Sequence, residues 1–233
     1  MRRALSFLTP IGGATAPDPR TLGWFPAVGA LMGLAVGAAW WGAERVWPAA
    51  AAAAIVVVAD LAITGLLHMD GLVDSADGLL PQLPRERRLA VMAEPTVGAY
   101  GVIAGAAALL LRFTALASMT PNVFLVAAAW CAARTTMAVA ARAVPYARHD
   151  GLATDLLGGD WRPVAAYGMA GSVLLAVLAD GELTVVAVVA GVLAGVGVVA
   201  LGWRRLGGFT GDVLGAAGVT VETVALLGAA ATC

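Results

Sequence analysis

Seven long apolar stretches run through this chain, and they restrict its fold more than any other feature of the sequence. A helix of about 20 apolar residues crosses the roughly 30 Å hydrocarbon layer of a membrane. Backbone polar groups inside lipid must bond to one another, so each stretch is expected to be a helix. The predicted spans are Trp24–Trp41, Ala49–Leu67, Gly98–Met119, Asn122–Val144, Val164–Ala179, Leu183–Leu201 and Val213–Ala231.

The composition agrees with a membrane protein. Hydrophobic residues make up 61% of the chain and charged residues only 12%, whereas soluble domains have about 45–50% and about 25%. This balance excludes a nucleic-acid-binding protein, a disordered chain and an ordinary cytosolic enzyme. We therefore predict an all-α fold, a polytopic helical bundle of about seven spans in a lipid bilayer, with residues 1–233 as one domain. A homo-oligomer is compatible with this fold.

The basic residues predict the orientation of the bundle. With the N-terminus in the cytoplasm and seven spans, the C-terminus lies outside. The fifth and sixth spans are short and close together, so a single re-entrant hairpin is an alternative that would not move the Arg-rich loops. All fourteen basic residues are Arg, and eleven of them then lie on cytoplasmic segments, as the positive-inside rule requires: Arg2, Arg3, Arg20, Arg85, Arg87, Arg88, Arg142, Arg148, Arg162, Arg204 and Arg205.

Three aspartates follow the second span on the predicted cytoplasmic side. Asp70, Asp74 and Asp77 are spaced i, i+4 and i+7, which places them on one face of a helix. Carboxylates held so close repel one another unless a cation joins them, and Mg²⁺ is the usual cation where carboxylates meet substrate phosphates. The sequence therefore predicts a Mg²⁺ site at Asp70, Asp74 and Asp77, with a solvated acidic loop as the alternative.

A glycine-rich turn precedes the last span on the same predicted side. It includes Gly208, Thr210 and Gly211, and Asp212 follows in the position of a helix N-cap. Glycines allow close approach to a ligand, and exposed N–H groups can hold phosphate oxygens. The turn is therefore a candidate phosphate-binding site, although a plain helix-entry turn is equally consistent with its composition.

Arg134 and Arg148 are candidate phosphate contacts, because an Arg guanidinium matches the geometry of a phosphate. Arg134 lies inside the fourth span, where pairing with a helix carboxylate is the alternative, and Asp60 is a second charge inside a span. His68 is interpreted as a bystander or a hydrogen-bond donor to substrate. Carboxylates, glycines and Arg together indicate metal-assisted chemistry on a phosphoanhydride, in which a hydroxyl displaces a nucleoside monophosphate.

At these residues the chain resembles the cobalamin synthase family, the adenosylcobinamide-GDP ribazoletransferases. His68 to Gly78 match the family pattern H-x-D-G-x-x-D-x-x-D-G. Four further segments are similar to family motifs and occur in the same order, so the resemblance covers almost the whole chain: Phe7-Leu8-Thr9 with Phe25-Pro26 and Gly29, Val91 to Glu94 with Val97 to Gly101, Pro145 to Arg148 with Gly151-Leu152, and Gly207 to Ala216.

The resemblance implies a reaction, a cofactor and a location. Adenosylcobinamide-GDP and α-ribazole, or its 5′-phosphate, would give adenosylcobalamin, or its 5′-phosphate, and GMP, with Mg²⁺ as cofactor, at the bacterial inner membrane. We predict that Asp74, Asp77 and Asp212 are catalytic, with Asp212 as a further metal ligand or the base. The predicted substrate-binding residues are His68, Arg134, Arg148, Gly208, Thr210 and Gly211.

The chain departs from the family pattern at three positions. Pro10 stands where the family usually has Arg, Glu94 where Asp is common, and Val219 where an acidic residue is frequent. The change at Pro10 puts substrate preference in doubt, while the intact aspartate motif argues for retained activity. Two other functions are weighed against this one. Asp74 to Gly78 is similar to part of the CDP-alcohol phosphotransferase motif, and a small-solute transporter would place polar sites near the membrane midplane in paired repeats.

Overall fold

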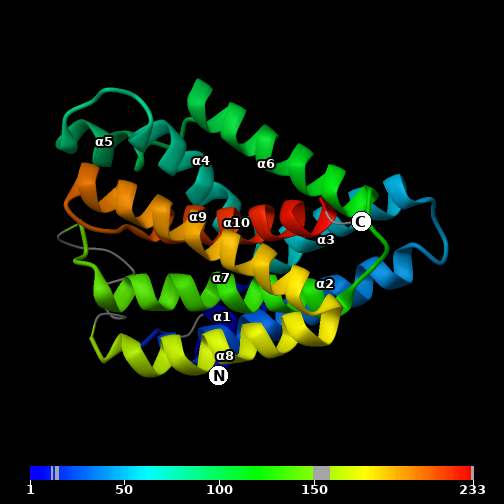
Figure 1. The fold of residues 1–233 in the computed structure, drawn as a ribbon. Helices are drawn as coiled ribbons and strands as arrows, with labels where there is room; N and C mark the ends of the chain where they lie inside the picture. The colour runs from blue at the N-terminus through cyan, green and yellow to red at the C-terminus, as the bar shows by residue number, and fades with distance from the viewer. Residues whose placement is uncertain (12, 14–15, 149–157, 232–233) are drawn as a thin grey trace.

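Helices packed side by side form a bundle in the computed structural model (Figure 1). The structure describes residues 1–11, 13, 16–148 and 158–231. Among these residues it forms ten α-helices and one 3₁₀ helix: α1 (Arg2–Leu8), η1 (Thr21–Trp24), α2 (Phe25–Ala43), α3 (Ala49–Thr64), α4 (Leu67–Leu79), α5 (Arg85–Val91), α6 (Ala99–Ala117), α7 (Val123–Ala143), α8 (Trp161–Asp180), α9 (Glu182–Leu206) and α10 (Gly211–Ala230).

The seven predicted spans correspond to α2, α3 and α6 to α10. Six of these are long and apolar enough to cross a membrane, with η1 continuing into α2, and α3 passes the same test only when joined to α4. The prediction of an all-α, multi-pass membrane protein is confirmed. The re-entrant alternative is wrong, because α8 has 20 residues and α9 has 25, and each is a full-length helix.

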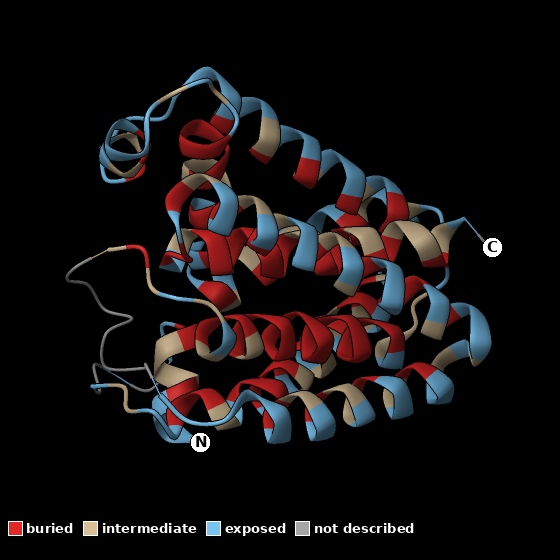
Figure 2. Cartoon of the chain, turned by 60° about the vertical axis from the view of Figure 1, so that its left-hand side comes forward, coloured by how far each residue is buried: buried red, intermediate tan, exposed pale blue. Residues whose placement is uncertain are grey.

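The centre of the bundle is α7, which packs against α2, α8, α9 and α10. Almost all of its residues are buried, whereas α6, α8 and α9 expose long apolar faces (Figure 2). Exposed side chains on these faces include Ile103, Leu110, Leu174, Val186 and Leu193. An outward apolar surface of this kind is what a lipid environment requires.

Glycines allow the central helices to approach closely. Gly29, Gly33 and Gly37 form a stripe on α2, and a Cβ atom at each would lie within 2.8 Å of the backbone of α7. Gly191 and Gly195 on α9 meet α10 in the same way. Their small-xxx-small spacing therefore serves packing inside the chain, as expected for helix pairs without a hydrophobic driving force.

The connections on one side of the bundle bring the predicted site segments together. The C-terminal end of α7, the beginning of α8 and the α9–α10 connection lie at one end, which we call the site end, and the C-terminus lies at the other (Figure 1). The first half of α4 packs on the beginning of α10 near this end, at Gly71 and Asp212. Exposed tryptophans occur near both ends: Trp24, Trp161 and Trp203 flank the site end, and Trp41 and Trp47 the opposite end. Tryptophans are enriched at both membrane surfaces, so this distribution agrees with spans that cross a bilayer.

A sharp bend separates α3 from α4. The two helices meet at 90°, and the turn uses left-handed backbone at Gly65 (φ 57°) and at Leu66 (φ 64°). Left-handed backbone costs little at glycine but is strained at leucine. The bend turns α4 across the site end of the bundle, and so ends the second span at Thr64, three residues before the predicted end at Leu67.

Candidate functional site

Two sequence motifs that lie far apart in the chain are joined at the site end. The N–H of Phe209 donates to the carbonyl of Pro145, and the N–H of Ala147 donates to the carbonyl of Phe209, both at 2.8 Å. Gly208 lies against Pro145 so closely that a Cβ atom would overlap its carbonyl oxygen. Gly208 is therefore required for this contact between two loops, and it is buried rather than open to a phosphate.

This junction places Arg148 beside Asp212. A guanidinium nitrogen of Arg148 lies 3.0 Å from Asp212 Oδ2, and both side chains are partly exposed. Thr210 is the N-cap of α10, because its hydroxyl accepts a hydrogen bond from the N–H of Val213. The expectation that Asp212 caps α10 is wrong. Asp212 lies in the first turn, where the positive end of the helix dipole favours a carboxylate, and accepts a hydrogen bond from the Thr210 hydroxyl at 3.2 Å.

Close packing of α4 on α10 brings the aspartate motif to the same place. A Cβ atom at Gly71 would lie 2.8 Å from the carbonyl oxygen of Asp212. Asp70 is exposed and Asp74 half-buried, and the negative charges of Asp70, Asp212 and Asp77 all act on the Asp74 carboxylate, with Arg148 as the cation nearby. The site therefore has more negative than positive charge in a small volume.

Asp77 has hydrogen-bond partners outside this cluster. Its two carboxylate oxygens accept hydrogen bonds from the N–H groups of Gly98, at 2.7 Å, and Gly101, at 2.8 Å. These N–H groups begin α6, so Asp77 occupies an anion site at a helix N-terminus. In this arrangement the carboxylate positions α6 against α4. The spacing of the motif predicted that all three aspartates ligate Mg²⁺. In the structure both Asp77 oxygens are hydrogen-bonded to the beginning of α6, and its part in metal binding stays a prediction.

The cluster fits a Mg²⁺ ion that is shared with a substrate. Among the described residues, no group of three or more His, Cys, Asp or Glu side chains is arranged to hold a metal ion without other ligands. Magnesium at phosphate sites uses only one or two protein carboxylates, and substrate phosphates and water complete its shell. Asp70 and Asp74, beside Asp212, supply that number of carboxylates, and the excess negative charge around Asp74 favours a cation.

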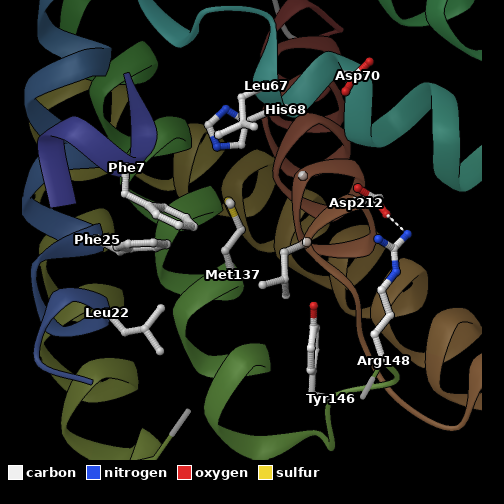
Figure 3. Close-up of a pocket in the computed structure, with 13 residues that line it drawn as sticks. Phe7, Leu22, Phe25, Leu67, His68, Asp70, Met137, Tyr146, Arg148 and Asp212 are labelled. Atoms are coloured by element: carbon white, nitrogen blue, oxygen red, sulfur yellow. Dashed lines mark hydrogen bonds and ion pairs between the residues drawn. The ribbon is translucent and has the colours of Figure 1, made fainter. Parts of the chain in front are cut away.

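A cavity of about 350 Å³ opens beside the cluster (Figure 3). Asp70, Arg148, Gly211 and Asp212 form part of its lining. A Cβ atom at Gly211 would meet no other atom within 4 Å, so this position faces open space. Cavities of this size are at the small end of the range for ligand pockets, which makes this the candidate substrate site.

Tyr146 and His68 also line the cavity. Burial raises the pKa of Tyr146, so its hydroxyl stays protonated and can donate a hydrogen bond. His68 is 3% exposed, and neither of its ring nitrogens has a hydrogen-bond partner among the described residues. The structure therefore places His68 where a substrate-binding residue is expected. The remaining residues of the Pro145 motif, Gly151 and Leu152, lie outside the described residues.

Three predicted substrate contacts, Gly208, Thr210 and Arg134, do not line the cavity. Gly208 and Thr210 are buried in the turn before α10, and Arg134 is in α7. Its side chain is fully buried and forms an ion pair with Glu222. Glu222 also pairs with Arg112, at 2.5 Å, and Arg112 pairs with Asp60 at 2.7 Å. The structure therefore contains the alternative arrangement for Arg134, in which it pairs with a carboxylate on another helix. The same network explains Asp60, whose other oxygen accepts from the indole N–H of Trp130.

Three Arg residues that were assigned only to topology support the site through backbone carbonyls. Arg85 donates to the carbonyls of Leu206 and Ala147. Arg88 and Arg205 donate to carbonyls at the C-terminal end of α4. Helix ends leave carbonyls unpaired, so these side chains tie α4, α5 and the two loops into one unit. Short sequence motifs could not predict such contacts, because the two partners of Arg85 are 62 and 121 residues further along the chain.

We expect the substitution Gly101→Ala to destabilise the protein and lower its activity. A Cβ atom there would overlap the Asp77 carboxylate and lie 2.8 Å from Val73, and overpacking of this kind costs about 1–3 kcal/mol. Gly42→Ala is the matched control, because a Cβ atom at Gly42 in α2 meets nothing within 4 Å. Thermal unfolding in detergent compares the two. Equal melting temperatures would contradict the role assigned to the Asp77 contact.

Comparison with known proteins supports the resemblance seen in the motifs. A curated relative from Bradyrhizobium diazoefficiens is 38% identical over 242 residues, covering 99% of this chain and 93% of the relative. A relative from Chlorobium phaeovibrioides is 34% identical, covering 90% and 86%. Both are named adenosylcobinamide-GDP ribazoletransferase. No solved structure matches the chain. The profile of the cobalamin-5-phosphate synthase family matches residues 1–230, and the chain therefore belongs to this family.

Proposed function

We propose that this protein is an adenosylcobinamide-GDP ribazoletransferase. A ribose hydroxyl of α-ribazole, or of its 5′-phosphate, attacks the phosphorus that carries the cobinamide. The new P–O bond replaces the bond between that phosphorus and the bridging oxygen of the diphosphate, and GMP leaves with this oxygen and the electron pair of the broken bond. The observation that carries the proposal is the pairing of an acidic cluster with Arg148 at the opening of a cavity, in a chain that belongs to this family.

The residues at the cavity opening have separate roles in this proposal. Asp70 and Asp74 would hold Mg²⁺ together with the substrate diphosphate, and the ion would neutralise charge on the leaving phosphate. Arg148 contacts a phosphate oxygen, and Asp212 positions Arg148 through their 3.0 Å ion pair. Asp212 also accepts the proton of the attacking hydroxyl. Gly211 leaves room for the substrate beside Asp212.

We further propose that the site end faces the cytoplasm of a bacterial inner membrane. Most of the Arg residues of the chain lie at this end, in the short helices α1 and α5, at the ends of α7, α8 and α9, and in the loops between them. Segments on the cytoplasmic side of a membrane carry such an excess. A site at this face would meet nucleotide-activated substrates directly from the cytoplasm. The exposed apolar faces of α6, α8 and α9 contact lipid in this arrangement.

The reaction is tested with the purified protein in proteoliposomes. We expect GMP to appear only when adenosylcobinamide-GDP, α-ribazole and Mg²⁺ are all present, and EDTA to stop its release, because carboxylates bind the substrate diphosphate through the cation. Chromatography of the corrinoid product checks that GMP release and cobalamin formation occur together. Turnover of a CDP-activated donor with a lipid alcohol, and none with adenosylcobinamide-GDP, would contradict the proposal and favour a CDP-alcohol phosphotransferase.

A further inference from the structure

The cavity beside the acidic cluster has an apolar side and a charged side. Phe7, Leu22 and Phe25 lie on one side, Asp212 and Arg148 lie on the other, and Met137 lies between the two groups (Figure 3). The rings of Phe7 and Phe25 are 5.9 Å apart between centroids and tilted by 33°. Aromatic rings at such distances offer favourable contacts to a further ring. A ligand that fills this cavity therefore has a flat apolar part and a polar part.

His68 is the polar group on the inner side of the cavity. Its ring lies above Phe7 and Met137 (Figure 3), it is 3% exposed, and both nitrogens lack a partner among the described residues. A buried polar group without a partner costs free energy, commonly 1–3 kcal/mol. An imidazole N–H aimed into a cavity therefore points to a ligand with one hydrogen-bond acceptor in an otherwise apolar ring.

We propose that the cavity binds the dimethylbenzimidazole base of the ribazole acceptor. His68 donates a hydrogen bond to the ring nitrogen that carries no sugar, and Phe7, Phe25 and Met137 contact the ring and its methyl groups. This inference rests on the proposed function, because ribazole is a substrate only in that reaction. It assigns the acceptor to this cavity and leaves the donor diphosphate at the acidic cluster.

The chemistry of the other substrate parts fits the cavity less well. Guanine has a carbonyl, an amino group and ring N–H groups around its edge, and an apolar wall would leave most of them unpaired. A corrin ring with its side chains is far larger than about 350 Å³. Dimethylbenzimidazole has one ring nitrogen as its acceptor, and the inner part of the cavity offers one histidine to match it.

The same placement brings the ribose to the reacting groups. With the base between the phenylalanines and His68, the sugar extends toward the charged side, where Tyr146, Arg148 and Asp212 lie (Figure 3). A ribose hydroxyl is then close to Asp212, the proposed base, and to the phosphates held at the cluster. One cavity therefore both recognises the acceptor and orients its nucleophile.

The test changes the two partners of the proposed hydrogen bond separately. The α-ribosides of dimethylbenzimidazole and dimethylindole differ only in that a C–H replaces the free ring nitrogen of the indole compound. For the wild-type protein we expect the indole compound to have a KM about tenfold higher, the loss expected for one unpaired donor. In His68→Phe the two acceptors should have the same KM. The KM for adenosylcobinamide-GDP should not change.

A second pair of variants tests the apolar wall. Phe25→Leu should raise the KM of both acceptors, whereas Phe113→Leu, a partly buried phenylalanine on α6 outside the cavity, should leave both unchanged. If His68→Phe does not fold, these two variants and the comparison of the two acceptors with the wild-type protein still test whether the cavity binds the base. Equal wild-type KM values for the two acceptors, or effects confined to the donor KM, would overturn the assignment. Absence of GMP release from wild type with the natural substrates would instead contradict the proposed function.

Discussion

Replacing Asp74 with asparagine is expected to slow GMP release by about a thousandfold. The charges of three carboxylates, Asp70, Asp77 and Asp212, act on the Asp74 carboxylate, and Asp74 is about one helical turn from Gly71, where α4 packs on α10. A bound cation stabilises the negative charge that develops on a transferring phosphate by several kcal/mol, and about 4 kcal/mol corresponds to three powers of ten in rate. Asparagine keeps the size of the side chain and removes the charge that holds the cation.

Two readouts distinguish a lost metal ligand from a damaged fold. The Mg²⁺ concentration that gives half-maximal rate should rise in Asp74→Asn, while the melting temperature stays equal or rises, because one of several repelling charges is gone. Glu86→Gln is the matched control: Glu86 is an exposed acid on α5 at the same end of the bundle, outside the cavity lining. Full turnover by Asp74→Asn at ordinary Mg²⁺ concentration would rule out the proposed metal site.

The spans could be predicted from the sequence because the signal is local. Apolar runs and the residues that end them determined α6 to within two residues at each end, and α7 to within one. The bend between α3 and α4 could not be predicted in the same way. It depends on left-handed backbone at Leu66, a residue with no local preference for that conformation. The packing of α4 on α10 stabilises the bend. The hydropathy of a segment carries no information about such contacts between helices, so it could not predict the bend.

The sequence predicted which acidic residues lie near one another, but it could not predict the contacts that other helices make with the predicted residues. Asp70, Asp74 and Asp212 do lie together, since α4 and α10 meet at Gly71. The spacing also included Asp77, but its carboxylate binds N–H groups 21 and 24 residues further along the chain. Arginine is a common phosphate ligand, so the sequence alone suggested that role for Arg134. The structure shows instead that Arg134 forms an ion pair with Glu222 on another helix. Helical periodicity predicts which residues lie on the same face of a helix, but it does not predict which other elements that face contacts.

Replacing Arg112 with methionine is expected to destabilise the protein by about 3–5 kcal/mol, the usual cost of breaking a buried charge pair. The Arg112 guanidinium donates to Asp60 at 2.7 Å, Glu222 at 2.5 Å and the Thr223 hydroxyl at 2.9 Å. These residues connect α3, α6 and α10. Without Arg112, two buried carboxylates share only Arg134, and the interior of the bundle offers no water to solvate the remaining charge.

Charge balance, rather than loss of packing, should govern the size of this effect. In the double variant Arg112→Met with Asp60→Asn, one negative charge is removed with the positive one, so we expect it to be more stable than Arg112→Met alone. Arg112→Lys should be intermediate, because an ammonium keeps the charge but cannot reach all the acceptors that the guanidinium holds. Leu116→Met, also buried on α6, is the control for methionine itself and should cost less than about 1.5 kcal/mol.

Unfolding of the four variants in mixed detergent measures the order of their stabilities. Two results would contradict the proposal that the charges of this network hold the three helices together. One is an Arg112→Met variant as stable as Leu116→Met, and the other is a double variant that is not more stable than Arg112→Met alone.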